Sequence, residues 1–353
     1  MICGDSTTGR LTILKSANLM RTDYIFSITN IKILIMGDCI SIRVLLMFLA
    51  LISYLTALTF NILALFGPWT GAFMQTTQYV LHKSTTHLTP DRWVLFLWDV
   101  LNVWLIGMFI YLIHNIRRRE AYTWMYTTPA VLPYGFYLSW IVNSILNMAW
   151  LFLYDKDFCV CHRMMVPALL ITALQAVSNC VIIMFSCYGL VVYGAWLHKY
   201  HNTDLWLIRI LVQNGVALYA TWWAVATFLH LTVVLDHQTH VPKTDAAIMV
   251  LVLLQLGLIG WFILENWYLD KHVRYILTEY PVVILVLAAS IANPATPGTH
   301  IDIMSAVILA ITSGLFIVRI VMVLWKHNNK PFYGEDELMS PVDIARTQKL
   351  IFM

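Results

Sequence analysis

Eight long apolar stretches constrain the fold of this chain more than any other feature of its sequence. Each has roughly 20 residues with almost no charge, which is the length that an α-helix needs to cross a membrane. The predicted spans are 41–66, 91–114, 129–154, 164–197, 205–235, 244–265, 272–293 and 301–325. With only 12% charged residues, a soluble chain would lack the charged faces that its helices need. The sequence therefore predicts an all-α, polytopic helical membrane protein with about eight transmembrane helices.

The Lys and Arg residues are distributed unequally between the two sides of the membrane. If the N-terminus is cytoplasmic, sixteen of the 22 fall in cytoplasmic segments. The opposite side holds only Lys83, Arg92, Lys156, Arg163 and Lys243. Since cytoplasmic loops carry an excess of basic residues, both termini are predicted to be cytoplasmic. The remaining basic residue, Arg319, lies inside the eighth span, where its side chain is expected to snorkel toward the cytoplasmic water.

Several classes of function are disfavoured by the sequence. A net charge of +3 is too small to indicate a nucleic-acid partner. No nucleotide-binding loop, zinc-protease helix or nucleophile elbow is present, and no cofactor, catalytic residue or enzymatic activity is expected. Cys159-Val-Cys161-His162 could bind a soft metal, but without a distant fourth ligand unpaired loop thiols are the preferred interpretation, and no metal site is predicted. Residues 1–40 show no cleavable signal pattern, and no targeting segment identifies the membrane or organelle.

The fifth span organises the other helices. On a 3.6-residue period, Tyr219, Trp222, Trp223, Ala226 and His230 share one broad face. His230 is costly in hydrocarbon unless it finds a partner or a water-lined cavity. This face is therefore predicted to point into the helix bundle.

Polar side chains also recur at helical spacing within three other spans. The three pairs are Asp99 with Asn102, Asn143 with Asn147, and Gln175 with Asn179. Residues three or four positions apart lie on the same helix face. We expect either an interhelical hydrogen-bond network or the lining of a ligand cavity, and both remain open.

Two carboxylates inside apolar sequence are candidates for proton coupling. Asp99 must be protonated, paired or hydrated, and His230 or Arg92 could be its partner. Glu279 precedes Pro281 in the seventh span and could belong to a proton or cation pathway, or simply lie at the interface.

Residues 41–235 resemble the translocator protein family (TspO/MBR), also called the tryptophan-rich sensory or peripheral benzodiazepine receptor family. In the second span the resemblance rests on Pro90-Asp91-Arg92-Trp93-Val94 and on Trp98. In the third and fifth it rests on Asn143, Asn147 and Trp150 and on Tyr219, Trp222, Ala226, Thr227 and Leu229, with His230 in place of the usual asparagine.

The resemblance implies a translocator-like five-helix core over 41–235 that binds a hydrophobic or amphipathic molecule such as a porphyrin or sterol, and it allows a homodimer. Residues 236–325 would add three transmembrane helices, and 1–40 and 326–353 would be cytoplasmic tails. The predicted ligand-binding residues are Trp93, Trp98, Asn102, Asn143, Asn147, Trp150, Tyr219, Trp222 and His230. Membrane lipid is the expected surrounding partner.

Two other functions stay open. One is a proton-coupled transporter or receptor that uses Asp99, His230 or Glu279, although no inverted repeat and no paired helix breaks are evident in the sequence. The other is a structural membrane component whose polar pairs only hold helices together.

Overall fold

The computed structural model describes residues 42–76, 79, 85–117, 131–160, 165–239, 241–293 and 300–330. The chain divides into two compact units, Met1–Phe48 and Leu49–Met353. Within the smaller unit, the described residues 42–48 are helical. The larger unit contains all the other described elements, and its described residues include no β-strand.

The described helical elements follow one another along the chain. The first helix continues to residue 66 and is followed by the 3₁₀ turn η1 (Gly67–Thr70). Next come η2 (Arg92–Leu95), α3 (Phe96–Arg117), α4 (Tyr134–Val160), α5 (Met165–Tyr200), α6 (Asn202–Leu207), the π-helix η4 (Ile208–Asn214) and α7 (Gly215–Gln238). The last described elements are α8 (Lys243–Ile263), the π-helix η5 (Leu264–Tyr268), α9 (Asp270–Val273), α10 (Glu279–Ile291) and α11 (His300–Asn329).

Seven of these helical segments are long and apolar enough to cross a membrane. Large apolar side chains lie on their outer surfaces; on α3, for example, Phe96, Val103 and Ile110 are 69%, 70% and 62% exposed. A soluble protein would not expose such continuous apolar faces, whereas lipid favours them. The predicted fold class is confirmed, and the chain is an integral, multi-pass, all-α membrane protein.

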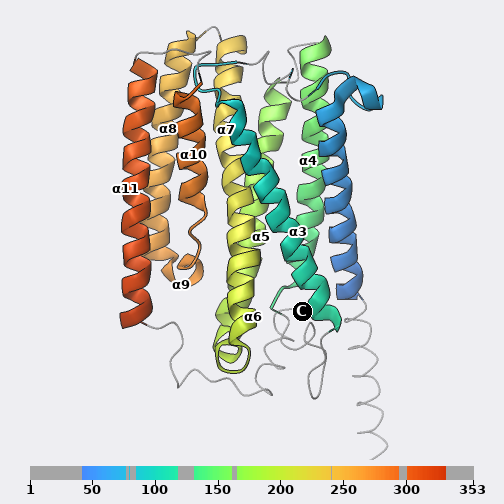
Figure 1. The fold of residues 1–353 in the computed structure, drawn as a ribbon, viewed down its shortest axis with the longest axis vertical. Coiled ribbons are helices and arrows are strands. Elements are labelled where there is room, and N and C mark those ends of the chain that lie inside the picture. The colour runs from blue at the N-terminus through green and yellow to red at the C-terminus, as the bar shows by residue number, and fades with distance from the viewer. Residues whose placement is uncertain are drawn as a thin grey trace, which may run out of the picture. The chain divides into compact units, whose positions relative to one another are not determined.

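Five helices of the larger unit run along the long axis of the view in Figure 1, and their contacts close them into a ring. The part of the first helix after Leu49 contacts α3 through Tyr54 and α4 through Asn61. The helix α5 packs against both α4 and α7, and α7 packs against α3. At the contact of α5 with the segment before α4, Gly189 lies so close to the Val131 carbonyl that a Cβ atom would be 1.8 Å from it.

The last helices lie beside this ring, and α7 belongs to both groups. Both α8 and α10 pack against α7, and α11 packs against α8 and α10. The segment before α3 is also joined to α10, because Ser290 Oγ donates to the Leu88 carbonyl at 2.8 Å and Asn293 Nδ2 donates to the Thr89 carbonyl at 2.9 Å. The division of the chain at residues 235 and 236 stays a prediction.

The seventh predicted span, 272–293, is interrupted in the structure. The helix α9 ends at Val273, residues 274–278 are not helical, and α10 begins at Glu279. Pro281 explains this start, because in a continuous helix it would lack the hydrogen bond to the residue 277 carbonyl and its ring would clash there. The 13 residues of α10 extend only about 20 Å at 1.5 Å per residue, less than a membrane core.

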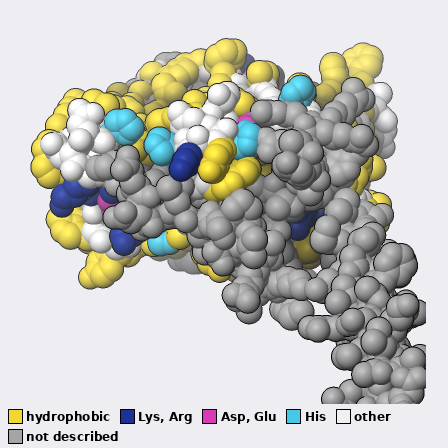
Figure 2. Space-filling model, turned by 90° about the horizontal axis from the view of Figure 1, so that it is seen from below, with side chains coloured by type: hydrophobic (Ala, Val, Ile, Leu, Met, Phe, Trp, Pro, Cys, Tyr) yellow, Lys and Arg dark blue, Asp and Glu magenta, His cyan; other side chains and the backbone are white. Residues whose placement is uncertain are grey.

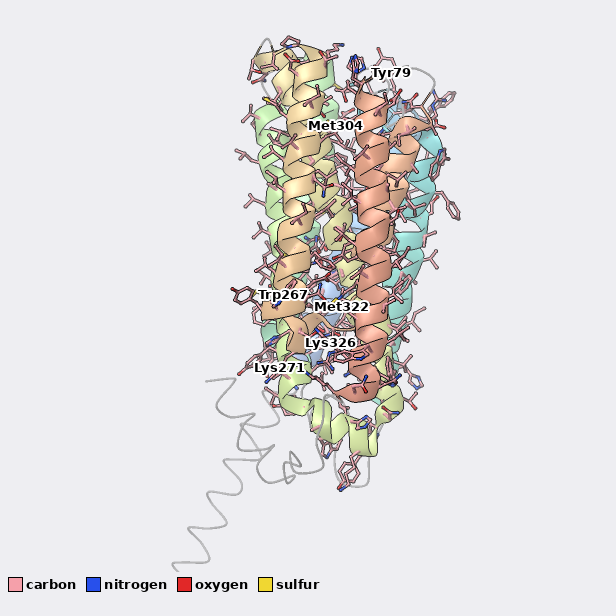
Figure 3. All side chains as sticks on the ribbon, turned by 90° about the vertical axis from the view of Figure 1, so that its left-hand side faces the viewer. Tyr79, Trp267, Lys271, Met304, Met322 and Lys326 are labelled. Atoms are coloured by element: carbon pink, nitrogen blue, oxygen red, sulfur yellow. The ribbon has the colours of Figure 1, made fainter. Side chains whose placement is uncertain are left out.

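One end of the larger unit carries a group of basic residues. Lys326 of α11 and Lys271 of α9 lie at this end, while Trp267 of η5 projects outward above them (Figure 3). Seen from this end, Lys, Arg and His side chains gather among the hydrophobic ones (Figure 2). The grouping agrees with the predicted cytoplasmic side, and the topology itself remains a prediction.

Candidate functional site

The polar side chains that sequence reasoning placed on inner helix faces meet at a small hollow inside the five-helix ring. We call this hollow, together with the side chains that line it, the amide hollow. Its lining consists of Tyr54, Ala57, Leu58, Asn61, Trp98, Asn102, Trp140, Asn143, Ser144, Asn147 and Tyr219. The unfilled space is enough for about one water molecule. Five of the nine predicted ligand-binding residues are among the lining residues.

Hydrogen bonds link the helices across the amide hollow. Asn61 Nδ2 donates to Asn147 Oδ1 at 2.8 Å, and Asn147 Nδ2 donates to the Tyr219 hydroxyl at 3.3 Å. The Tyr54 hydroxyl donates to Asn102 Oδ1 at 3.3 Å. Sequence reasoning missed Tyr54 and Asn61, although their seven-residue spacing on one face of the first span was a usable signal.

Aromatic rings from α3, α4 and α7 form a wall beside the amide hollow. Trp98 lies 6.0 Å from Tyr219, 5.8 Å from Trp222 and 5.9 Å from Trp223, measured between ring centroids. Trp140 lies 6.2 Å from Tyr219. These distances fall within the range in which aromatic rings attract one another.

The aromatic wall continues along α4 and α7. Trp150 lies 5.3 Å from Trp223 and 5.8 Å from the ring of His230. His230 also contacts Tyr154 at 5.2 Å, and its Nδ1 lies 3.0 Å from the Ala226 carbonyl. Trp150 and His230 therefore adjoin the hollow without lining it.

Three predicted residues occupy other positions. Trp93 is 45% exposed on η2, and Asp99 is exposed on α3. Trp222 is partly buried and also packs against the apolar cluster formed by α7, α8 and α10. The helical period correctly groups Asp99 near Asn102, but only Asn102 reaches the hollow.

Some buried polar atoms near the hollow have no hydrogen-bond partner among the described residues. They include Nε1 of Trp140, Oδ1 of Asn179 and both amide atoms of Gln175. Gln175 and Asn179 are fully buried, and the Trp140 side chain is 2% exposed. Because buried polar groups are normally hydrogen-bonded, these atoms favour a polar partner in this region.

A second polar region lies where α8, η5, α10 and α11 meet, and we call it the ionic cluster. Its members are Trp261, Glu265, Asn266, Glu279, Tyr280 and Arg319. Arg319 and Glu265 are each 0% exposed, and their Nε and Oε2 atoms are 3.4 Å apart. The expectation that Arg319 snorkels to water is therefore wrong, because its charge is compensated inside the protein by Glu265.

Further hydrogen bonds hold the ionic cluster together. Arg319 donates to Asn266 Oδ1 at 2.7 Å and to the Val273 carbonyl at 3.0 Å. The hydroxyl of Tyr280 donates to Glu265 Oε1, and the indole N–H of Trp261 donates to Glu279 Oε2. Arg319 thus joins a carboxylate, an amide and the end of α9.

The non-helical residues 274–278, which interrupt the helix before α10, also form hydrogen bonds with Asn214, the last residue of the π-helix η4. Asn214 Nδ2 donates to the Tyr275 carbonyl at 2.8 Å, and the Leu277 N–H donates to Asn214 Oδ1 at 2.9 Å. The Thr278 hydroxyl donates to the Asn214 carbonyl at 2.8 Å. Two of these three bonds use the Asn214 side chain, and the third uses its backbone carbonyl.

An outer set of charges lies next to the ionic cluster. Asp270 accepts hydrogen bonds from Arg274 at 2.7 Å and from Lys326 at 2.8 Å. Burial acts to raise the pKa of Asp270, but these two cations outweigh it and hold the pKa below its usual value.

The structure shows no conventional metal centre in the part of the chain that it describes. Within those residues, no three His, Cys, Asp or Glu side chains come together as metal ligands. The side chains of Cys159, Cys161 and His162 lie outside the described residues.

Comparison with known proteins identifies no relative. No family model, no curated protein and no solved structure matches the chain. The class of protein therefore rests on the fold, which is a multi-pass membrane protein with an aromatic helix bundle.

Proposed function

We propose that this protein is a translocator-like membrane protein that binds a hydrophobic or amphipathic small molecule, of the porphyrin or sterol class, at the amide hollow. The observation that carries the proposal is the convergence of amide and phenol groups from the first helix, α3, α4 and α7 on one hollow with a tryptophan wall. Binding sites for such molecules combine apolar and aromatic walls with a few placed polar groups. The closed ring of five helices also agrees with the core that the resemblance to the translocator family implies.

The hollow must open to admit such a ligand, because its present space suits about one water molecule. The first helix is the natural element to move. At the hollow, two side-chain hydrogen bonds join the first helix to the other helices, from Asn61 to Asn147 and from Tyr54 to Asn102. A ligand hydroxyl or carboxylate would replace these bonds and would also accept from the free indole N–H of Trp140.

A second candidate function is proton-coupled transport. The interrupted seventh span and the buried ionic cluster favour it, because interrupted helices and intramembrane charges accompany ion coupling in transporters. Of the three candidate groups Asp99, His230 and Glu279, only Glu279 belongs to the ionic cluster, so Glu279 is the group to test. Flux in proteoliposomes that follows a pH gradient, and that Glu279→Gln abolishes, would establish it.

The binding proposal is tested by a thermal-shift and tryptophan-quenching screen of detergent-purified protein against protoporphyrin, haem, sterols and retinoids. A molecule that prefers the folded state raises its apparent stability. We expect saturable quenching and stabilisation by one class. The effect should weaken in Trp98→Ala, which removes a ring that lines the hollow, and persist in the matched control Trp267→Ala, since Trp267 is 68% exposed and does not line the hollow. Equal affinity in both folded variants would contradict the assignment of the site.

A further inference from the structure

Ionic contacts hold the short helix α9 against the end of α11. Asp270 of α9 accepts hydrogen bonds from Lys326 of α11 at 2.8 Å and from Arg274 at 2.7 Å. Arg274 Nη1 also donates to the carbonyl of Lys330, which directly follows α11, at 2.8 Å. Lys271 follows Asp270 on α9, and the side chains of Lys271 and Lys330 are both exposed. The contacts therefore bring two exposed lysines onto one surface, which we call the α9–α11 surface.

The charges beneath the α9–α11 surface cancel one another. There are three of each sign, the carboxylates of Glu265, Asp270 and Glu279 and the cations of Arg274, Arg319 and Lys326. On the neighbouring α6 and η4, Asp204 and Arg209 add one charge of each sign. Lys271 and Lys330 remain, and neither forms an ion pair with a carboxylate of the described residues. Within the described chain, the surface thus carries two positive charges without a counterpart.

An exposed tryptophan lies about one helical turn before each of these lysines. Trp267 is 68% exposed and stands four positions before Lys271, and Trp325 is 55% exposed and stands five positions before Lys330. The Lys330 ammonium nitrogen is 6.0 Å from the centroid of the Trp325 ring. Figure 3 shows Trp267 projecting outward on the same side as Lys271. Because tryptophan side chains gather at the boundary between hydrocarbon and water, the two lysines lie at the level of the lipid headgroups.

This combination of groups fits an anionic lipid better than a partner that arrives from water. A nucleic acid or an acidic protein would reach the lysines and leave the tryptophan rings against the hydrocarbon, whereas a phospholipid offers both a phosphate and acyl chains. A basic residue near the membrane surface strengthens the binding of anionic lipid about fivefold, the equivalent of about 1 kcal/mol. The headgroup of a zwitterionic lipid carries no net charge and gains little from this attraction.

We propose that the α9–α11 surface is a binding site for an anionic phospholipid, with Lys271 and Lys330 at the headgroup phosphate and Trp267 and Trp325 against the acyl chains. Binding is non-covalent and exchanges with the surrounding lipid. This inference is independent of the ligand proposed for the amide hollow.

Native mass spectrometry of the full chain, released from detergent, tests the proposal. Two lipids with the same acyl chains are titrated separately: phosphatidylglycerol, whose headgroup carries one negative charge, and phosphatidylcholine, which carries no net charge. The wild type should bind the first phosphatidylglycerol at least about tenfold more tightly than phosphatidylcholine. The double variant Lys271→Gln/Lys330→Gln should lose this preference, because both unpaired charges are removed.

Two further double variants serve as controls. Arg92→Gln/Lys243→Gln removes the same charge from exposed positions at the opposite end, since η2 lies beside the last turn of α10 and Lys243 begins α8. Lys271→Arg/Lys330→Arg keeps both charges, and arginine also binds phosphate. Both controls should retain the preference for phosphatidylglycerol. Circular dichroism checks that all variants keep the helical content of the wild type.

Three results would overturn the proposal. One is equal affinity of the wild type for the two lipids, which would leave the surface to another acidic occupant, such as the segment Glu335-Asp336-Glu337 of the same chain. Another is a preference that survives Lys271→Gln/Lys330→Gln. The third is an equal loss of preference in the two glutamine double variants, which would assign the effect to net charge and not to this surface.

Discussion

The amide hollow and the ionic cluster are both buried and polar, but they satisfy their polar groups in different ways. In the amide hollow, side chains also bond within their own helix: Asn102 donates to the Trp98 carbonyl and Asn61 to the Ala57 carbonyl, both at 2.8 Å. In the ionic cluster, the side-chain bonds that Arg319 makes within the described residues go to other elements. The amides can therefore exchange partners at small cost, whereas the charges cannot separate without compensation. This difference suits the first region to the exchange of hydrogen-bond partners and the second to holding its helices together.

The largest expected effect comes from removing one charge of the buried pair Glu265 and Arg319, and this substitution tests the difference between the two regions most strongly. Arg319→Met leaves Glu265 buried and unpaired, which should lower the free energy of unfolding by about 3–5 kcal/mol. Thermal unfolding in detergent, followed by circular dichroism, measures the loss. The double variant Glu265→Gln/Arg319→Met removes both charges and should recover much of it. If Arg319→Met alone were as stable as the wild type, the ion pair would not be needed for the stability of the fold.

A smaller effect is expected at Asn214, which bonds to the non-helical residues before α10. Asn214→Ala removes the side-chain bonds to Tyr275 and Leu277 and should cost about 2 kcal/mol, because two partly buried backbone groups lose their partners. Hydrogen exchange of the Leu277 amide should become faster. The exposed Asn329→Ala is the control and should change neither quantity. Unchanged exchange at Leu277 would mean that another contact holds the interruption.

A substitution in the amide hollow should lower the free energy of unfolding less than a substitution in the ionic cluster does. Asn147→Ala removes the bonds with Asn61 and Tyr219, and interhelical bonds in membranes are worth about 0.6 kcal/mol each. We therefore expect a loss of about 1 kcal/mol in the same unfolding measurement. A loss as large as that of Arg319→Met would remove the distinction between the two regions.

The smallest expected effect is on how folding stability depends on pH in the acid range. Because the folded-state pKa of Asp270 lies below its unfolded value, its contribution is present above about pH 4 and is lost as the pH falls through the folded pKa. The contribution should stay below about 1 kcal/mol, as for ion pairs near the surface. Asp270→Asn should flatten this part of the stability profile between pH 5 and pH 2. An acid dependence identical to that of the wild type would assign the effect to other carboxylates.

Hydropathy predicted the membrane class and the long spans, because each span satisfies its backbone within one helix and so leaves a local signal. It did not predict the interruption before α10, although Pro281 marked the place. The helical period grouped Asn143 with Asn147 correctly. It could not show which neighbour each face meets, so Asp99 was expected inside and Arg319 was expected in water. Contacts between distant spans, such as Arg319 with Glu265, have no local pattern in the sequence.

The most direct test of the account is a titration of the wild type, Asn147→Ala and Asn329→Ala with protoporphyrin and, in a separate series, with a sterol, followed by tryptophan quenching. The two substitutions remove the same amide group, one at the amide hollow and one at an exposed position near the end of α11. We predict saturable quenching in the wild type and in Asn329→Ala, and at least about tenfold weaker binding in Asn147→Ala, which corresponds to about 1.4 kcal/mol. Equal affinity in all three proteins, or no saturable binding in any, would contradict the claim that the hollow is a ligand site.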